Sequence, residues 1–418
     1  MSSILTNNGA MVALQTLNTI NKNLLMTQNE ISTGKSIASA KDNAAIWSIS
    51  QVMQSDVDGF TVIRDSLALG QSTVAVGRSA AEQVTELLGE IKEQIVASQE
   101  DNMDRTTLQE DLASLRDQIT AIVSAAQFNG QNLLSNTSTT TGEGEIEVLA
   151  SLDRDANQNV TSTNITVAKQ DLGQGDNTAG TTGTTAGGNV AIAAGASGVA
   201  VDFASTSIEA GQTFDLDLSG GVSAGADIAL TSTVSYVARE GDTMADVTEQ
   251  LAARANFEAA LGGVEDLVSF SVNSADNSQI LLQNDSANAI TVATADANED
   301  LNGANLDGVI GGGVELLGDI DVSTEAGAAA ALSAIEVLTQ TSIEAAAEFG
   351  TGERRLEIQD DFISKLTDSL VSGIGSLVDA NMEVASARLQ ALQVQQQLGI
   401  QSLSIANQAP QNILSLFR

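Results

Sequence analysis

The chain has 418 residues, a hydrophobic content of 42%, and a formal net charge of −37 at pH 7 from 17 basic and 54 acidic residues. A surface this acidic repels nucleic acid and anionic membranes, so we expect neither as a partner. The chain has no cysteine and no histidine, which excludes disulfides, thiolate chemistry and the most common general base. Aromatic residues make up only 3% of the chain, which predicts aliphatic, alanine-rich cores.

Residues 1–40 predict a first helix with one apolar face. The apolar positions of that face are Leu14, Leu17, Leu24 and Ile31. Asn21 and Gln28 fall at inward positions between them, where a buried amide costs stability but fixes register and partner number. Ser32-Thr33-Gly34 predicts the end of this helix. Residues 1–15 lack a basic region followed by an apolar core, so we expect no cleavable signal peptide.

A second, longer helix is predicted from near Asp42. Its apolar residues recur at alternating spacings of three and four from Ile46 to Ile95, and this pattern is interrupted only at Asp56, Gly70 and Gly77. After a polar turn around residues 101–104, the pattern resumes and predicts a further helix. That helix–turn–helix is expected to end at Phe128-Asn129-Gly130.

The middle of the chain, from about residue 136 to 320, is dominated by Thr, Ser, Gly and Asn. Short alternating apolar runs such as Ile146-Glu147-Val148 predict strands, and residues 174–188 predict a loop. Thr243 and Asp246 have the spacing of a capping box that opens a helix. The predicted inner face of that helix is Met244, Val247, Leu251 and Ala255.

Helix is predicted to return at about Thr324, with a turn near Gly350 to Gly352 and a second weak point between Val378 and Met382. Eight apolar residues of this region follow one another at a spacing of seven: Leu356, Ile363, Leu370, Leu377, Val384, Ala391, Leu398 and Ile405. A strict period of seven predicts a helix that supercoils left-handedly around partner helices.

The predicted fold is multidomain, with long helices from both termini in a coiled coil and bundle and an inserted, β-rich α+β outer domain. Residues 1–40 and 383–418 are assigned to a terminal coiled-coil domain. Residues 41–175 and 321–382 are assigned to a helical bundle domain with a β-hairpin. Residues 176–320 are assigned to a variable, surface-exposed α+β domain.

The two outermost segments differ from the rest in what can cover them. The helices of residues 42–128 and 324–378 can bundle within one chain, whereas residues 1–40 and 383–418 carry thin apolar stripes without a third partner. We therefore expect these stripes to be covered by other copies of the chain. The predicted subunit-interface residues are Leu14, Leu17, Leu24, Ile31, Ala391, Leu398, Ile405, Ile413 and Leu416.

No motif predicts catalysis, a cofactor or a metal. Residues 153–164 open like a calcium loop, but Gln158 replaces the required glycine and Asn164 replaces the final glutamate. Gly311-Gly312-Gly313 has no following Lys-Ser/Thr, so it predicts no phosphate site. No apolar run is long enough to cross a bilayer, so no membrane insertion is expected. The sequence predicts a protein that is not an enzyme.

Three motifs resemble those of a known family. Ile31-Ser32-Thr33-Gly34, with residues 37–45 after it, resembles the stretch LSSGxxINSAKDDAA of bacterial flagellins. Residues 127–134 resemble the FNG corner of that family, and residues 406–416 are similar to its C-terminal ANQxPQNVLSLL. Arg239-Glu240-Gly241-Asp242-Thr243 resembles a motif shared by flagellins and hook-associated proteins.

The resemblance implies a structural subunit that self-assembles through its terminal helices into the flagellar filament for swimming motility. It implies a secreted, extracellular protein and, as partners, further copies of the chain, the flagellar export apparatus, a chaperone, and the hook-associated junction and cap proteins. In the family the two terminal segments pair as the innermost coiled coil around an export channel. Two alternatives remain open: a hook–filament junction protein, and a filament subunit with an adhesive or carbohydrate-active outer domain.

Overall fold

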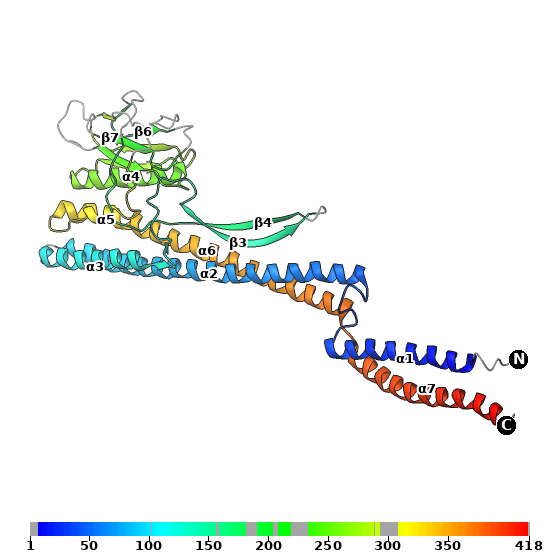
Figure 1. The fold of residues 1–418 in the computed structure, drawn as a ribbon. Coiled ribbons are helices and arrows are strands. Elements are labelled where there is room, and N and C mark those ends of the chain that lie inside the picture. Colours follow the sequence, from blue (N-terminus) through cyan, green and yellow to red (C-terminus); the bar gives the residue numbers. More distant parts are fainter. Residues whose placement is uncertain are drawn as a thin grey trace. The chain divides into compact units, whose positions relative to one another are not determined.

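The computed structural model describes residues 7–100, 102–155, 159–180, 190–203, 208–218, 233–287, 289–292 and 308–416, the last eight of them as backbone only (Figure 1). The chain divides into two compact units. The first unit contains residues 1–64 and 361–418, and the second contains residues 65–360.

The first unit is built on two helices from opposite ends of the chain. Helix α1 (Asn8–Thr33) and helix α7 (Met382–Leu416) pack along each other. The Asn7 side chain accepts a hydrogen bond from the backbone N–H of Ala10 at 3.1 Å and so caps α1. Gly34, with φ of 69°, ends α1 in the left-handed conformation. The predicted first helix and its end are confirmed.

The two predicted helix breaks of this unit lie side by side. The backbone N–H of Ser36 donates to the carbonyl of Val378 at 2.7 Å, and the N–H of Ala380 donates to the carbonyl of Gly34 at 2.9 Å. Helix α6 (Glu325–Val378) ends at this point. The Asn381 side chain then accepts hydrogen bonds from the N–H groups of Glu383 and Val384, at 3.1 and 3.2 Å, and caps α7.

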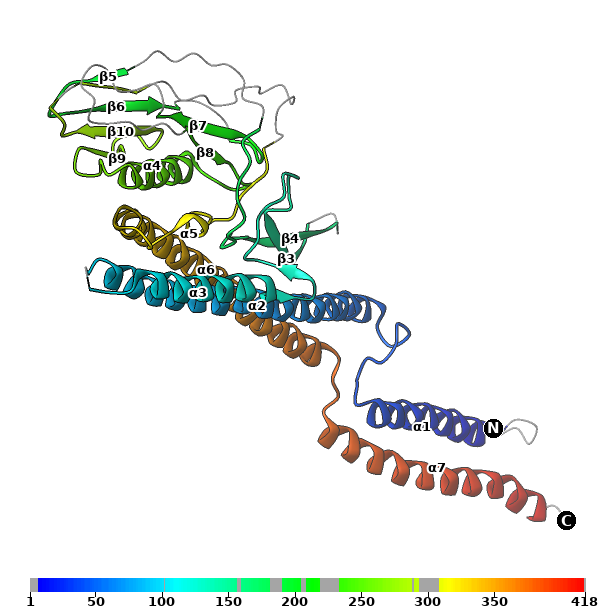
Figure 2. The same cartoon turned by 90° about the vertical axis from the view of Figure 1, so that its left-hand side faces the viewer.

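The second unit contains a bundle of long helices. Residues 65–98 of α2 (Ala44–Ser98), α3 (Arg105–Ala125) and residues 325–360 of α6 lie side by side (Figure 2). Their shared core is aliphatic, as expected, and its fully buried members include Leu67, Leu88, Ile91, Ile95, Leu112, Ile119, Ile335 and Leu356. Arg78 pairs with Glu353 at 2.7 Å, and the Thr85 and Ser342 hydroxyls lie 2.8 Å apart. These contacts join α2 to α6.

One predicted turn is wrong. Helix α6 runs without a break through Gly350 and Gly352. Glycine within a helix costs about 1 kcal/mol relative to alanine, but tertiary packing overrides so small a preference. A Cβ atom added to Gly352 would lie 3.1 Å from the Val167 side chain. The glycine therefore makes room for a neighbouring strand and does not end the helix.

Two hairpins lie beside this bundle. Strands β1 (Gln127–Phe128) and β2 (Gln131–Asn132) are joined by Asn129 and Gly130, both with positive φ, the geometry of a type I′ turn. Strands β3 (Glu145–Arg154) and β4 (Val160–Ala168) form a longer antiparallel hairpin with a register shift between Leu149 and Ser151. The Gln359 side chain donates to the carbonyl of Ala150 at 2.8 Å and ties this hairpin to α6.

The inserted segment has a core of its own. Strands β6 (Ala196–Asp202), β10 (Gln279–Asn284) and β9 (Val268–Val272) form an antiparallel sheet in that order, and α4 (Met244–Leu261) packs against it (Figure 2). Strand β5 (Val190–Ile192) pairs with β11 (Ile290–Val292), and β7 (Thr213–Asp217) pairs with β8 (Thr233–Val237). The predicted α+β insertion is confirmed.

Helix α4 also confirms its sequence signals. The Asp246 carboxylate accepts a hydrogen bond from the backbone N–H of Thr243 at 2.7 Å, at the start of the helix. Val247, Leu251 and Ala255 are fully buried in the core of the insertion, and Met244 packs against that core. Residues 181–188 of the predicted loop lie outside the described residues.

Two further features complete the fold. Helix α5 (Leu316–Asp319) is a single short turn that follows the insertion. Thr178 and Val309 exchange backbone hydrogen bonds of 3.0 and 2.9 Å, which bring the two ends of the insertion together. Among the described helices, none combines the length and apolar character that crossing a membrane requires.

Candidate assembly interface

The seam between α1 and α7 is a narrow line of small and aliphatic side chains. On α7 the buried and half-buried positions recur at spacings of three and four: Ala385, Leu389, Leu392, Gln396, Gly399, Leu403 and Ala406. On α1 the corresponding positions are Ala10, Ala13, Leu17, Ile20, Leu24, Thr27 and Ile31. This spacing is the signature of two helices packed as a coiled coil.

The seam runs antiparallel and has polar contacts along its length. The Asn7 side chain donates to the carbonyl of Ala406 at 2.8 Å, and the Gln396 side chain donates to the side-chain oxygen of Asn21 at 2.7 Å. A Cβ atom added to Gly399 would lie 3.1 Å from the Leu17 side chain. The inward position predicted for Asn21 is therefore correct, and its amide is paired.

Gln28 was expected at an inward position, and this prediction is wrong. Its side chain is exposed, and Thr27, with 2% exposure, occupies the seam instead. The buried line of α1 keeps alternating spacings of three and four through Ile20, Leu24, Thr27 and Ile31, and position 28 falls beside that line.

The predicted interface residues divide into three groups. Leu17, Leu24 and Ile31 are half-buried in the seam. Leu14, Ala391, Leu398 and Ile405 are exposed, and the exposed fractions of Leu398 and Ile405 are 55% and 69%. Ile413 and Leu416 belong to α7, but their side chains lie outside the described residues. The pairing of the two terminal segments therefore uses only part of the predicted set.

The seven-residue repeat changes its environment along the chain. Leu356 and Ile363 are fully buried, Leu377 is 39% exposed, and Val384 is 54% exposed. The break after Val378 accounts for the change in α7, because the buried positions of the new helix keep a spacing of seven but begin at Ala385 and not at Val384. In α7 the buried seam lies one residue later, and the original repeat is left facing solvent.

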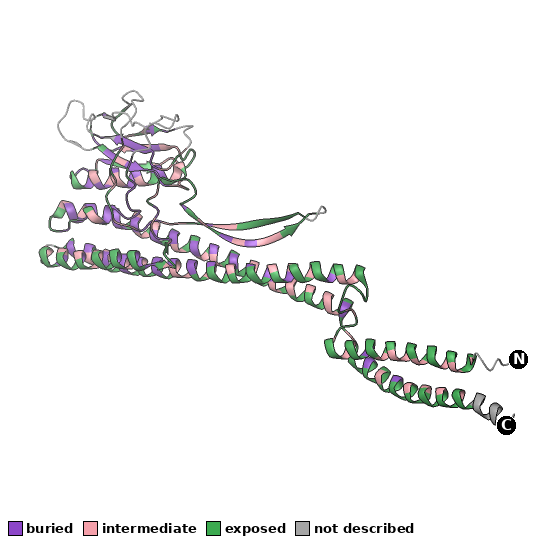
Figure 3. Ribbon diagram, viewed as in Figure 1, coloured by how far each residue is buried: buried purple, intermediate pink, exposed green. Residues whose placement is uncertain are grey.

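Several exposed apolar residues were not among the predicted interface positions. Met11, Val12, Leu25 and Met26 of α1 and Val394 and Ile400 of α7 are all more than half exposed. Figure 3 shows how much of both helices is exposed. Helix α1 is therefore apolar on the side facing α7 and also on other sides. A search of the sequence for one stripe of apolar residues at helical spacing finds only one of these surfaces.

A groove of about 530 Å³ runs between the two helices and is open to solvent. It is lined by Gly9, Val12, Ala13, Thr16, Ile20, Gln395, Leu398, Gly399 and Ser402. Val12 and Leu398, both exposed, thus belong to one surface formed jointly by the two ends of the chain. Apolar surface of this kind is typical of sites for other macromolecules.

Charge is nearly absent from this surface. Helix α1 contains only Lys22 and Glu30 as charged residues, and α7 contains only Glu383 and Arg388. Each helix therefore carries no formal net charge, although the whole chain carries −37. Copies that meet through these helices avoid the repulsion that the acidic remainder would impose.

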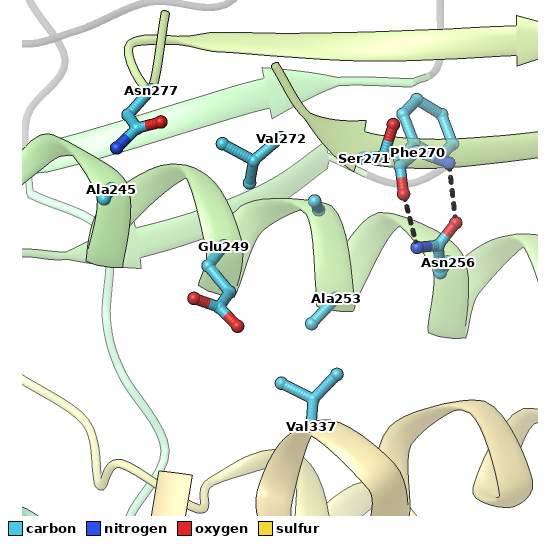
Figure 4. A pocket seen from close by; sticks show the side chains of 10 residues that line it. Ala245, Glu249, Ala253, Asn256, Phe270, Ser271, Val272, Asn277 and Val337 are labelled. Atoms are coloured by element: carbon cyan, nitrogen blue, oxygen red, sulfur yellow. Dashed lines mark hydrogen bonds between the residues drawn. The ribbon is translucent and has the colours of Figure 1, made fainter. Parts of the chain in front are cut away.

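The second unit contains a cleft of about 440 Å³ between α4 and α6, drawn in Figure 4. Its lining is mostly alanine, valine and amide, and the Asn256 side chain is occupied in hydrogen bonds to the backbone of Phe270, at 2.7 and 2.8 Å. Burial, reinforced by the carboxylates of Glu344 and Asp246, raises the pKa of Glu249. Among the residues that line this cleft, Glu249 is the only one with a carboxylate.

The Arg239–Asp242 loop, noted in the sequence as a shared motif, joins several segments of the second unit. Arg239 is buried and donates to the Tyr236 hydroxyl at 2.8 Å and to the carbonyl of Gly311 at 3.0 Å. The Glu240 carboxylate accepts hydrogen bonds from the N–H groups of Gly142 and Gly144, at 2.5 and 2.6 Å. The bond from Gly142 is the largest cause of the lowered pKa of Glu240. The loop is a structural connection between the insertion and the base of the β3–β4 hairpin.

Comparison with known proteins identifies the family. The bacterial flagellin N-terminal helical region matches residues 4–139, and the bacterial flagellin C-terminal helical region matches residues 332–417. Flagellin B of Rhizobium meliloti is 34% identical over 429 residues, and the match covers 100% of both chains. Flagellin FljM of Caulobacter vibrioides is 28% identical over 421 residues, and the match covers 100% of this chain and 99% of the relative.

A solved structure of FliC from Burkholderia pseudomallei matches 68% of this chain and 99% of its own, at 17% identity and a TM-score of 0.31, which is too low to bear on the fold. The full-length relatives are named flagellins, which supports the filament subunit over the junction-protein alternative. The chain belongs to the bacterial flagellin family, whose members are structural, non-enzymatic subunits of the extracellular flagellar filament.

Proposed function

We propose that copies of this chain polymerise through the apolar side chains that α1 and α7 leave exposed when they pair. The single observation that carries this proposal is that the helices at the two ends of an acidic chain expose apolar side chains and carry no net charge. Leu14 and Met11 of α1 and Leu398 and Ile405 of α7 are all more than half exposed. Covering a large aliphatic side chain stabilises an association by about 1.5–3 kcal/mol before the costs of ordering are counted.

The mode of association follows from the geometry of a single chain type. When a contact between two different surfaces of identical copies does not close into a ring, its repetition generates a helical filament. The predicted interface residues that the seam leaves exposed, Leu14, Ala391, Leu398 and Ile405, would then lie between copies together with Ile413 and Leu416. We assign residues 1–40 and 383–418 to the filament core, residues 41–175 and 321–382 to the surrounding helical layer, and residues 176–320 to the outer surface.

Other partners follow from membership of the family. We propose that the chain is handled by the flagellar export apparatus and a chaperone before assembly, and that it meets the hook-associated junction and cap proteins at the two ends of the filament. The exposed apolar residues of α1 and α7 are the surface that a chaperone would have to cover, because they are the part of the chain prone to premature association.

Salt-driven polymerisation tests the proposal. Ammonium sulfate strengthens the burial of apolar surface and screens the acidic remainder of the chain, so it should convert dilute monomers into filaments visible by electron microscopy. A truncated chain that lacks residues 1–40, and another that lacks residues 383–418, should stay monomeric at the same salt concentration. Filaments formed by either truncated chain would contradict the role of the terminal helices.

A further inference from the structure

We propose that the thioethers of Met11 and Met26 form an oxidation site that decides whether a free copy of the chain can assemble. The inference rests on the proposed function, because it requires the outward surface of α1 to be covered in the polymer. In the thioether state both side chains are apolar and suit that contact. Oxidation to the sulfoxide makes each side chain polar and unsuited to it.

Exposure singles out these two residues among the methionines that the structure describes. The exposed fractions of Met11 and Met26 are 65% and 64%, compared with 44% for Met382 and 41% for Met103. Met53 and Met244 are half-buried, and Met244 packs against the core of the insertion. Because the chain has no cysteine, methionine is its main sulfur target for oxidants.

The position of the two residues connects them to assembly. Both lie on α1 away from the seam residues Leu17 and Leu24, and about four helical turns separate them. Leu14 and Leu25, each at least half exposed, accompany them on the outward part of the helix. Helix α1 has no charged residue from Asn8 to Asn21, the part that contains Met11, and its two charged residues, Lys22 and Glu30, each lie four positions from Met26.

The chemistry needs a two-electron oxidant such as hydrogen peroxide. The thioether sulfur attacks one peroxide oxygen, the O–O bond breaks, and the products are one methionine sulfoxide and one water molecule. Sulfur is oxidised by two electrons and the peroxide is reduced by two. The reverse change requires a thiol-dependent methionine sulfoxide reductase, which restores the thioether.

A sulfoxide in the contact is unfavourable for a definite reason. Its oxygen is a hydrogen-bond acceptor, and burial without a donor leaves it unsatisfied. The same oxygen in the free monomer stays hydrated, so oxidation should leave the monomer folded. The modification therefore acts on the association step and not on the fold of the chain.

The experiment compares monomers and salt-induced filaments exposed to hydrogen peroxide for equal times. Peptide mass spectrometry measures the gain of one oxygen at each methionine. We expect Met11 and Met26 to be oxidised at least about tenfold faster in monomers than in filaments, the factor that about 1.4 kcal/mol makes in an equilibrium. Met244 should react slowly in both samples, because the core of the insertion shields it in both states.

Oxidised monomers are then returned to polymerising salt. We expect the polymerised fraction to fall at least about tenfold at the concentration where untreated protein half assembles. Treatment with the reductase should restore assembly without any substitution in the chain. The matched variant Met11→Leu/Met26→Leu, given the same peroxide treatment, should assemble like untreated protein.

The outcomes separate this inference from the proposed function. If Met11 and Met26 react equally fast in monomers and filaments, the outward surface of α1 is not covered, and both proposals fail at that surface. If they are protected in filaments but oxidised monomers assemble normally, only the oxidation inference is overturned. If peroxide blocks the double variant as strongly as the wild type, another group is responsible and the assignment to Met11 and Met26 is wrong.

Discussion

Gly70 of α2 lies so close to Val148 of β3 that a Cβ atom added to the glycine would be 2.6 Å from a valine methyl carbon. Gly70 is one of the two glycines that interrupt the apolar pattern of this helix in the sequence. The other, Gly77, has Leu133 and Phe349 at 3.3 and 3.4 Å from the corresponding position. Each glycine therefore lies where another segment packs closely against α2: β3 at Gly70, and the residue after β2 together with α6 at Gly77.

Substitution of Gly70 by alanine should therefore destabilise the β3–β4 hairpin. Alanine favours the helix by about 1 kcal/mol, but overpacking against a β-branched side chain costs about 1–3 kcal/mol. The short contact distance places this site at the upper end of the overpacking range, and we expect the free energy of unfolding to fall by about 1–2 kcal/mol. Thermal unfolding measures the loss, and limited proteolysis of residues 137–144 reports whether the hairpin is released.

Gly89→Ala in the same helix is the matched control. No atom lies within 4 Å of its added Cβ, so we expect a gain of about 0.5–1 kcal/mol. If both substitutions shifted the melting temperature upward equally, the close approach of Val148 would have no energetic consequence.

Charge on the outward residues of α7 should block assembly without unfolding the monomer. Leu398→Asp and Ile405→Asp replace side chains that are 55% and 69% exposed, so we expect the monomer's free energy of unfolding to change by about 0.5 kcal/mol or less. Burial of the new carboxylate in a contact between copies should abolish filaments on electron micrographs.

Leu392→Asp provides the contrast on the same helix. Leu392 is 7% exposed in the seam, so its replacement should cost about 3 kcal/mol or more and separate α1 from α7. Circular dichroism should then detect a loss of helix for this variant alone. Normal filaments from the Leu398 and Ile405 variants would show that these residues do not contact other copies.

Acidification should loosen the connection between the insertion and the β3–β4 hairpin. The hydrogen bond from the Gly142 amide is the largest of the interactions that lower the pKa of Glu240, so this pKa is lower in the folded chain than in the unfolded chain. The stabilisation that the ionised Glu240 carboxylate provides is fully present at pH values above its pKa in the unfolded chain. It is lost as the pH falls through the pKa of Glu240 in the folded chain. Because the carboxylate is partly solvated, we expect its contribution to be about 1 kcal/mol or less.

Glu240→Gln should reproduce the acid effect at neutral pH. Hydrogen exchange at Gly142 and Gly144 should be faster in the variant than in the wild type at pH 7, and the two proteins should converge as the pH is lowered below the folded-state pKa. Protection factors at Gly142 and Gly144, corrected for the intrinsic pH dependence of exchange, that change neither with pH nor with the substitution would contradict the proposed role of the carboxylate.

Removal of the insertion should leave the terminal helices able to assemble. Thr178 and Val309 already exchange two backbone hydrogen bonds, so a short Gly–Ser linker can replace residues 180–307. We expect the shortened chain to form filaments by electron microscopy, with faster exchange at Gly142 because Glu240 is lost. Absence of filaments, with helix content retained, would show that the insertion supplies contacts essential for assembly.

The helices and their breaks could be predicted from the sequence because local signals agree with the fold. Gly34, the residues around 378–382 and the Thr243–Asp246 pair each act through backbone or capping geometry within a few residues. The turn predicted at Gly350–Gly352 is wrong because Gly352 serves a different purpose. It leaves room for the side chain of Val167, which lies far away in the sequence. A single sequence does not reveal that a glycine serves a distant neighbour.

The exposed apolar surface of the two terminal helices, which we propose for assembly, could be predicted only in part. The seven-residue repeat correctly located an apolar surface on α7, but the buried seam is shifted by one residue through Leu392 and Gly399. The shift follows the break at Val378, after which a new helix starts with its buried positions one residue later than the repeat. Met11 and Val12 were missed because they lie outside the single stripe that periodicity selects.

The most direct test of the central claim is hydrogen exchange of the amides in α1 and α7, measured in dilute monomers and in filaments. The outward apolar surfaces of these helices gain cover only from other copies, so their amides should exchange at least about tenfold more slowly in filaments. Amides of the second-unit core, such as those of Ile91 and Leu112, should be protected in both samples. If the amides of α1 and α7 were as strongly protected in the dilute monomer as in the filament, the claim that neighbouring copies cover these helices would be contradicted.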